Sequence, residues 1–154
     1  AFLLRDDIET IHAATDLLAE AKLSPELRNE ALYYRAKAYT KQKAGKKAME
    51  DYRELAKDTR NPYGAEAKYQ VAQSLYDAKE YAAAEKELLN YIEQSTPHAY
   101  WLARSFVLLS DVYHATGKDL DARQYLLSLQ QNYQGNDDIE SRIESRLSEL
   151  KVEN

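Results

Sequence analysis

Residue types that do chemistry in proteins are scattered through this chain of 154 residues. Its histidines, His12, His98 and His114, stand far apart, and neither H-x-x-x-H nor H-E-x-x-H spacing occurs. The sequence has no cysteine for a thiolate metal site and no glycine-rich phosphate loop. Adjacent carboxylates such as Asp6 and Asp7 are typical of helix starts. We therefore expect no enzymatic activity, no metal site and no cofactor.

Composition and charge exclude further classes. The net charge of −5 argues against a nucleic-acid-binding protein, because neutralising phosphates requires a basic surface. No run of 18 apolar residues occurs, so we expect no transmembrane segment. The first residue is not Met, and we expect a mature form or an excised fragment. Glycine and proline are scarce, at 4 and 3 residues, which indicates a helical protein.

The stretch 65–96 shows how the helices are arranged. It holds two amphipathic helical patterns separated by a short polar break at 77–80. Their apolar positions are Lys68, Val71, Ala72 and Leu75 in the first pattern, with Lys68 as an exception, and Ala84, Leu88 and Tyr91 in the second. Each pattern needs a partner surface, so we expect an antiparallel helical hairpin. One hairpin cannot bury both stripes, and the chain supplies further copies.

Prolines mark the copies. Ser24-Pro25, Asn61-Pro62 and Thr96-Pro97 each pair an N-capping residue with a proline suited to the first helical turn. We expect Gly45 and Gly117 to break the hairpins and Gly135 to end a helix, with Asn136 or Asp137 capping the next. We therefore expect one domain, residues 1–154, with a partial repeat at 5–21, repeats at 25–60, 62–95 and 97–134, and a capping helix at 137–151.

Small residues recur with the same period. Ala14, Ala48, Ala84 and Ala122 are separated by 34, 36 and 38 residues, and each is expected where the two helices of a hairpin come closest. A period near ~34 is that of tetratricopeptide repeats. The first helix of each copy carries four positions at i, i+3, i+4 and i+7: Leu32, Arg35, Ala36 and Tyr39; Lys68, Val71, Ala72 and Leu75; Phe106, Leu109, Ser110 and Tyr113.

Over about residues 5–151 the chain resembles the tetratricopeptide repeat family. Arg35, Lys68 and the missing glycines of the second copy depart from the family pattern. The resemblance implies an all-α fold: a right-handed α-solenoid of stacked antiparallel helix hairpins with a C-terminal capping helix. The repeat spacings and proline-led turns are more similar to bacterial envelope members of the family, which favours the periplasm or cell envelope of a bacterium over the cytoplasm. The sequence itself does not name the compartment.

In such a solenoid the first helices form the concave wall. Helical phase predicts that Val107 and Leu108 lie on this wall together with the candidate partner-binding groove, which consists of Tyr33, Tyr34, Lys37, Lys41, Tyr69, Gln70, Gln73, Tyr76, Asp77, Asp111 and His114. Tyrosines and amides suit an adaptable peptide groove. Alternatively, the tyrosines pad the inner surface or pack between repeats, since the chain has 13 of them.

Basic residues give a weaker signal. Lys37, Lys41 and Arg104 could clasp a carboxylate, but the accompanying asparagines of the family are missing. The lysines from Lys37 to Lys47 are expected to form a solvated turn rather than a site for an acidic partner or a lipid head group.

These patterns predict a protein–protein interaction scaffold that binds a peptide or protein segment in its concave groove. The alternative is a structural module that self-associates or docks within a larger chain and has no separate groove ligand. An enzyme with a helical domain is the least favoured interpretation.

Overall fold

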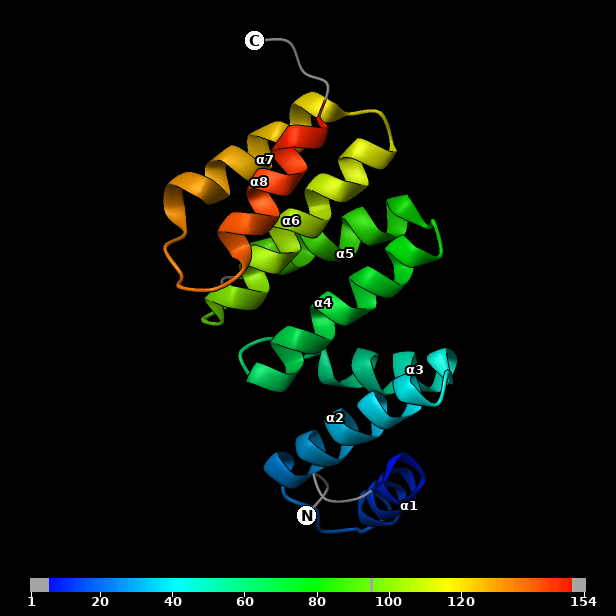
Figure 1. Ribbon diagram of the computed structural model, residues 1–154. Coiled ribbons are helices and arrows are strands. Elements are labelled where there is room, and N and C mark those ends of the chain that lie inside the picture. Colours follow the sequence, from blue (N-terminus) through cyan, green and yellow to red (C-terminus); the bar gives the residue numbers. More distant parts are fainter. Residues whose placement is uncertain (1–5, 95, 151–154) are drawn as a thin grey trace. The chain divides into compact units, whose positions relative to one another are not determined.

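Eight α-helices and no strand make up the part of the chain that the computed structural model describes, residues 6–94 and 96–150 (Figure 1). They are α1 (Asp7–Leu18), α2 (Pro25–Lys41), α3 (Gly45–Leu55), α4 (Pro62–Asp77), α5 (Tyr81–Glu93), α6 (Ala99–Ala115), α7 (Asp119–Asn132) and α8 (Ile139–Glu149). The predicted all-α fold is confirmed over these residues. None of the helices described is long and apolar enough to cross a membrane.

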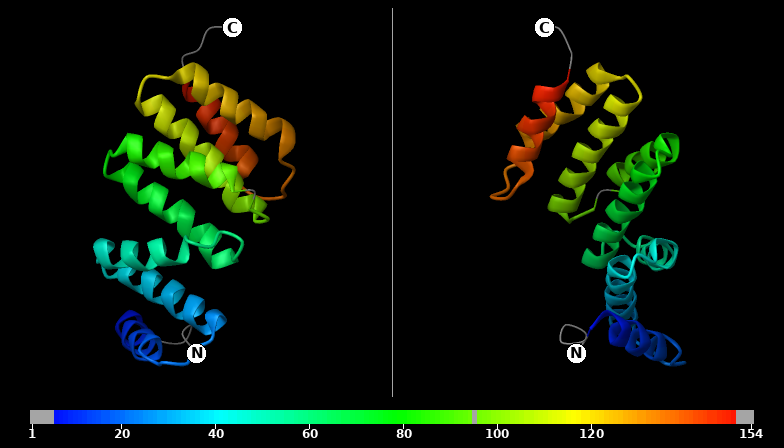
Figure 2. Two further views of the ribbon diagram at one scale, coloured as in Figure 1. Left: turned by 180° about the vertical axis from the view of Figure 1, so that it is seen from behind. Right: turned by 45° about the vertical axis from the view of Figure 1, so that its right-hand side comes forward.

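The chain divides into two compact units, Ala1–Val71 and Ala72–Asn154, and the division falls inside α4. In the first unit, α2 packs against both α1 and α3. In the second, α6 packs against α5 and α7, and α8 lies against both α6 and α7 (Figure 1, Figure 2). The prediction of one continuous repeat domain concerns the placement of the two units and stays a prediction.

Three hairpin turns share one hydrogen-bonding pattern. Each has a residue with left-handed backbone: Lys43 (φ 57°), Lys79 (φ 61°) and Gly117 (φ 79°). The amide that follows donates to a carbonyl five residues back: Ala44 to Tyr39 (2.8 Å), Glu80 to Leu75 (2.9 Å) and Lys118 to Tyr113 (2.7 Å). This is the Schellman ending, which satisfies carbonyls at the end of a helix.

The turns correct one prediction about glycine. Gly45 does not provide the left-handed residue of the first turn, because it is already the first residue of α3. Lysines take the left-handed position in two turns, at Lys43 and Lys79, although glycine adopts this backbone at less cost. The glycines missing from the second copy are therefore not needed to form its turn.

Buried small residues allow close approach. Ala14, Ala48, Ala84 and Ala122 are each no more than 3% exposed, as their spacing predicted. Gly64 has an equally strict role that the sequence did not reveal. A Cβ atom there would lie 1.8 Å from the carbonyl oxygen of Asp58, so only glycine lets the start of α4 approach the backbone that follows α3.

Helix starts agree with the capping predictions in the first unit. The Ser24 hydroxyl accepts from the Leu27 amide (3.3 Å), and the side-chain Oδ1 of Asn61 accepts from the Tyr63 amide (2.8 Å). The second unit departs from them. Thr96 accepts from the His98 amide, but α6 begins only at Ala99, two residues after Pro97.

The loop between α7 and α8 also differs from expectation. Tyr133, not Gly135, is the C-cap of α7, and its backbone is extended. The cap position of α8 is Asp138 rather than Asn136 or Asp137, although the Asp137 carboxylate accepts from the Ile139 amide (3.0 Å). The α7–α8 connection therefore leaves the helix at Tyr133 and bends at residues 136–138 before α8 begins.

Candidate binding surfaces

The predicted groove residues divide between the two units. The first unit holds Tyr33, Tyr34, Lys37, Lys41, Tyr69 and Gln70, and the second holds Gln73, Tyr76, Asp77, Asp111 and His114. Each set is described within its own unit. A single groove formed by all eleven side chains stays a prediction.

A tyrosine cluster forms in the first unit from Tyr33 and Tyr34 on α2 and Tyr63 in the first turn of α4. The Tyr33 ring centroid lies 5.3 Å from that of Tyr34, edge to face, and 4.5 Å from that of Tyr63. All three residues are partly exposed. Sequence phase identified the two tyrosines of α2, but it missed Tyr63 because the start of α4 was read only as a capping signal.

Charged groups flank one side of the tyrosine cluster. The Tyr33 hydroxyl donates to Glu66 Oε1 (2.9 Å). The ammonium of Lys37 lies 4.9 Å from the Tyr33 ring centroid and 3.7 Å from Glu66 Oε2. Lys37 is therefore held over an aromatic face while its side chain stays 44% exposed. This arrangement offers an incoming segment apolar ring area, a cation and hydrogen-bonding groups within a few ångströms.

Burial raises the pKa of the Tyr33 hydroxyl, and the hydrogen bond to Glu66 adds to the rise. Burial also raises the pKa of Tyr63, with further contributions from the nearby Tyr34 and Glu30. Both hydroxyls are thus neutral at physiological pH. They present hydrogen-bond donors rather than phenolate charges.

Tyr69 does not belong to this exposed surface, because its side chain is only 5% exposed. The prediction assumed that α4 buries a single stripe. Instead Ala65, Ala67 and Tyr69 are buried as well as Val71 and Ala72, so a wider arc of the helix is covered. Lys41, at the end of α2, is exposed as expected.

The groove residues predicted in the second unit contact neighbours in the chain. Gln73 donates to Asp77 one helical turn later (2.9 Å), and the Tyr76 ring lies 5.6 Å from that of Tyr81. His114 Nδ1 and Asp119 Oδ1 are 2.8 Å apart across the α6–α7 turn.

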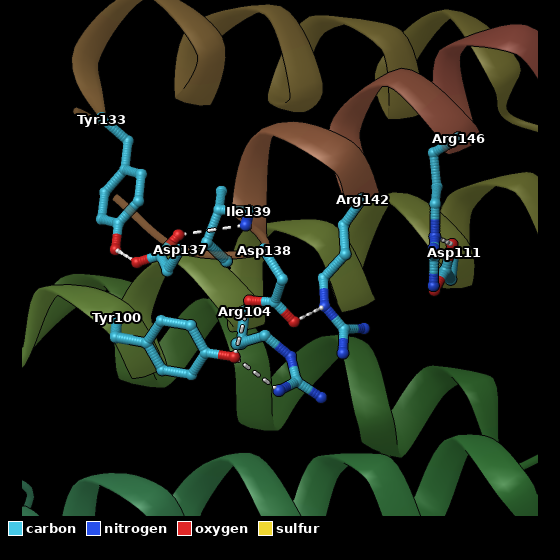
Figure 3. Close-up of polar contacts among 9 residues, drawn as sticks. All are labelled: Tyr100, Arg104, Asp111, Tyr133, Asp137, Asp138, Ile139, Arg142 and Arg146. Carbon is cyan, nitrogen blue, oxygen red and sulfur yellow. Dashed lines mark hydrogen bonds and ion pairs between the residues drawn. The ribbon is translucent and has the colours of Figure 1, made fainter. Parts of the chain in front are cut away.

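Asp111 on α6 has a partner on α8. Its carboxylate accepts from Arg146 Nε (3.2 Å) and Nη2 (3.4 Å) (Figure 3). Burial raises the pKa of Asp111, and Arg146 opposes that rise. Val107 and Leu108, also predicted on the wall, are buried at 2% and 3% exposure. Val107 lies in the core cluster that α8 completes, so α8 covers part of the α6 surface that the sequence assigned to a partner.

Helix α6 and the start of α8 are also joined by a polar network. The Tyr100 hydroxyl accepts from Arg104 Nη1 (3.0 Å) and donates to Asp138 Oδ1 (2.9 Å) (Figure 3). The other Asp138 oxygen accepts from Arg142 Nε (2.7 Å), and Arg142 lowers the pKa of Asp138. Nearby, the Tyr133 hydroxyl donates to Asp137. Sequence analysis found none of these pairs: Tyr100 and Asp138 are 38 residues apart, and the other three pairs, each four residues apart, were not considered.

The guanidinium of Arg35 makes the most buried ion pair described. Its Nε and Nη2 atoms lie 2.8 and 2.7 Å from the two oxygens of Asp51, and Nη1 donates to the Thr15 hydroxyl (3.2 Å). Asp51 is 4% exposed. Arg35, a departure from the repeat pattern, therefore ties α1, α2 and α3 together. The sequence did carry one signal of this pair. A carboxylate stands three residues after Ala48, and an arginine stands on the stripe of the helix that packs against it.

Neither metal-binding side chains nor similarity to known proteins gives a further indication of function. Across residues 6–94 and 96–150, no three or more His, Asp or Glu side chains are grouped so as to hold a metal ion. No protein-family model matches the chain, and searches of curated proteins and of solved structures found no significant match.

Proposed function

We propose that this chain is a tetratricopeptide-like scaffold that binds an extended or helical segment of another protein through its tyrosine cluster. The supporting observation is the contact of three partly exposed tyrosine rings, Tyr33, Tyr34 and Tyr63, beside Lys37 and Glu66. Tyrosine supplies large contact area with few rotatable bonds and is enriched at protein interfaces and among their hot spots. Clustered aromatic rings at a surface favour an interaction role over a purely structural one.

The proposal extends to the architecture. The repeated turn geometry, the buried alanines near a 34-residue period and the polar-backed α8 support a right-handed solenoid of stacked hairpins with α8 as its cap. A bacterial envelope location follows only from the resemblance in sequence and remains part of the proposal.

Capture from a lysate of the source organism provides the first test. The immobilised chain should retain a protein that the Tyr63→Ala variant loses. Tyr39→Ala is a matched control, because Tyr39 lies on the same helix as Tyr33 but outside the tyrosine cluster. With the purified partner, we expect Tyr63→Ala to weaken binding at least about tenfold, the order of a hot-spot residue. Equal retention by both variants would exclude this surface.

A variant at Lys37 distinguishes electrostatic steering of the partner from the energy of direct contact. Lys37→Ala should weaken binding mainly at low salt, because exposed charges act on association rate over a screened range. Lys57→Ala is the control, since Lys57 is an exposed lysine in the turn after α3, where it pairs with Glu54 (2.7 Å). The alternative function, self-association without a groove ligand, predicts instead a mass that rises with concentration in light scattering and no captured partner.

A further inference from the structure

We propose that one face of α2 binds an extended segment of another protein in which a basic residue, a large apolar residue and two acidic residues occupy every second position. This binding mode rests on the proposed function, because the apolar residue lies on the tyrosine cluster, and it adds the chemical class of the segment. The face consists of Glu30, Tyr34, Lys37 and Lys41 and is called the α2 strip.

Helix geometry places the four strip residues on one side of α2. They are separated by four, three and four positions, which is the spacing of neighbouring side chains along one face of an α-helix. All four are exposed or partly exposed. Leu32 and Ala36, on the opposite side of α2, are buried at 5% and 0% exposure. The strip is therefore a surface feature of the first unit, and its charges are not part of the hairpin core.

The first end of the strip is acidic. Burial raises the pKa of the Tyr63 hydroxyl, and Tyr34 and Glu30 add to that rise, which places Glu30 close to the tyrosine cluster. Tyr34 packs against the small core cluster of α1 and α2, and this contact holds its ring in position. Among the described residues Glu30 forms no ion pair, so its carboxylate can pair with a cation that lies beside the tyrosine cluster.

The other end of the strip is basic. The ammonium of Lys37 lies 4.9 Å from the Tyr33 ring centroid and 3.7 Å from Glu66 Oε2, a separation longer than a hydrogen bond. Lys41 is the last residue of α2, is exposed, and forms no ion pair with a residue that the structure describes. Further exposed lysines follow in the turn and at the start of α3 (Figure 1): Lys43, Lys46 and Lys47. This end therefore attracts carboxylates of a partner.

The spacing of the strip suits an extended chain. At a rise of about 1.5 Å per residue, neighbouring strip positions stand about 4.5–6 Å apart along the α2 axis. An extended chain places the side chains of one face about 6.6 Å apart, at every second residue. A helix packed on α2 most often crosses it at about 50° and leaves the line of the strip within about two turns. An extended segment can follow the strip over all four positions.

The change of charge along the strip selects a protein segment over a phosphate-rich surface. A nucleic acid or an anionic membrane would meet Glu30 as well as the lysines, and the chain as a whole carries a net charge of −5. Like charges that face each other oppose binding. A segment with a basic residue opposite Glu30, an aromatic residue on the tyrosine cluster and acidic residues opposite Lys37 and Lys41 is complementary at each position.

Two peptides test this assignment with the full chain. Because a segment can follow the strip in either chain direction, the probes are fluorescein-labelled Lys-Ser-Phe-Ser-Asp-Ser-Asp and the same residues in reverse order. One of them should bind, and Lys41→Glu should weaken its binding about five- to tenfold in fluorescence anisotropy at low salt. Lys46→Glu is the control, because it changes the charge of the same turn equally but lies on α3. It should weaken binding less than about threefold.

Charge exchange then tests the register. In the peptide that binds, the Asp farther from Phe is replaced by Lys. This peptide should bind the Lys41→Glu chain about five- to tenfold more tightly than it binds the unaltered chain. A peptide of the same composition, in which the Asp nearer to Phe is replaced instead, should prefer the unaltered chain. Lys41 and Lys46 are exposed, so both variants should keep the helical spectrum.

Each outcome decides the proposal. Opposite preferences of the two exchanged peptides support it. Equal weakening by Lys41→Glu and Lys46→Glu, or the same preference for both exchanged peptides, overturns it, because general attraction then explains the binding. Failure of both probes to bind also overturns it. Sedimentation with phosphatidylserine vesicles that both lysine variants lose equally would assign the lysines to a membrane and overturn the assignment to a protein segment.

Tyr63→Ala separates this proposal from the proposed function. If neither probe binds but the immobilised chain still retains a protein that Tyr63→Ala loses, the α2 strip is excluded and the tyrosine cluster keeps its role. If a probe binds Tyr63→Ala as well as the unaltered chain, its aromatic residue does not lie on the tyrosine cluster, and this proposal fails whatever the lysate contains.

Discussion

The hairpins α2–α3 and α6–α7 share a close-approach alanine, Ala48 or Ala122, but differ in the contact beside it. In α2–α3, Arg35 and Asp51 form a bidentate ion pair of 2.7 and 2.8 Å. In α6–α7 the corresponding positions are Leu109, which is fully buried, and Tyr125. The Tyr125 ring stacks on Tyr113 with a centroid distance of 5.6 Å. One repeat pattern thus tolerates either a charge pair or an apolar contact.

This difference shows what each kind of contact, the ion pair and the apolar contact, contributes to the fold. A buried ion pair must overcome the cost of desolvating both charges, so its net stabilisation is small compared with apolar packing of the same volume. It supplies direction instead. The guanidinium reaches Asp51 on α3 and Thr15 on α1 at once, and this fixes three helices relative to one another. Leu109 contributes buried apolar area, and apolar burial has no directional preference.

The largest effect should come from removing one member of the ion pair. Asp51→Ala leaves the Arg35 charge largely buried and unpaired, and we expect a loss of about 3–5 kcal/mol in unfolding free energy, measured by urea titration. Glu50→Ala, an exposed neighbour, should change stability by less than about 0.5 kcal/mol. A small loss for Asp51→Ala would mean that water compensates Arg35.

Replacing the ion pair by the apolar contact of the other hairpin tests that result further. The double variant Arg35→Leu with Asp51→Tyr places the residues of α6–α7 in α2–α3. It should be more stable than Asp51→Ala alone, because no buried charge is left unpaired. A double variant less stable than Asp51→Ala would show that the first unit cannot adopt the apolar contact.

The position that the hairpins share should respond alike in both units. Ala48→Leu and Ala122→Leu each overpack a contact of close helices, and we expect each to cost about 1–3 kcal/mol in urea titration. Ala82→Leu is the control, because Ala82 is exposed on α5. A loss of stability at only one of the two positions would show that the hairpins differ in packing as well as in charge.

Turn residues distinguish the two hairpins more weakly. Lys43 carries a side chain in left-handed backbone, whereas Gly117 does not. Lys43→Gly should stabilise by about 0.5–1 kcal/mol, and Gly117→Lys should destabilise by about 1 kcal/mol. A Cβ atom at Gly117 meets no atom within 4 Å, so this measurement isolates backbone strain. Thermal melting of both variants measures the difference, and shifts in the same direction would contradict it.

Acid titration should give the smallest effects, with opposite signs in the two units. Lys57 lowers the pKa of Glu54, so its stabilising contribution is present above the unfolded-state pKa and is lost as pH falls. Burial raises the pKa of Asp111, so its contribution is present at low pH and is lost as pH rises through the folded-state pKa.

Melting temperatures between about pH 3 and pH 7 can separate these contributions. Relative to the unaltered chain, Glu54→Gln should lose stability as pH rises, whereas Asp111→Asn should gain it. Parallel pH profiles for the two variants would contradict the assigned causes.

Helical periodicity determined much of the local structure. The spacing of alanines predicted the close contacts at Ala48, Ala84 and Ala122, and proline placement predicted the starts of α2 and α4. Periodicity also placed Tyr33 and Tyr34 together on one helix. These features depend on residues close in sequence, where helix geometry alone fixes which side chains share a face.

Tertiary structure decided which of those faces remained available. The tyrosine cluster needs Tyr63 from another helix, Tyr69 is buried because α4 is covered over a wider arc than its stripe, and Asp111 meets Arg146 only because α8 folds back onto α6. The Arg35–Asp51 pair likewise joins two helices; each helix pattern shows a charge on its stripe, but neither shows that the two charges meet. Periodicity specifies a face but not its occupant, because the partner across a contact is chosen by long-range packing and charge pairing between segments far apart in the chain.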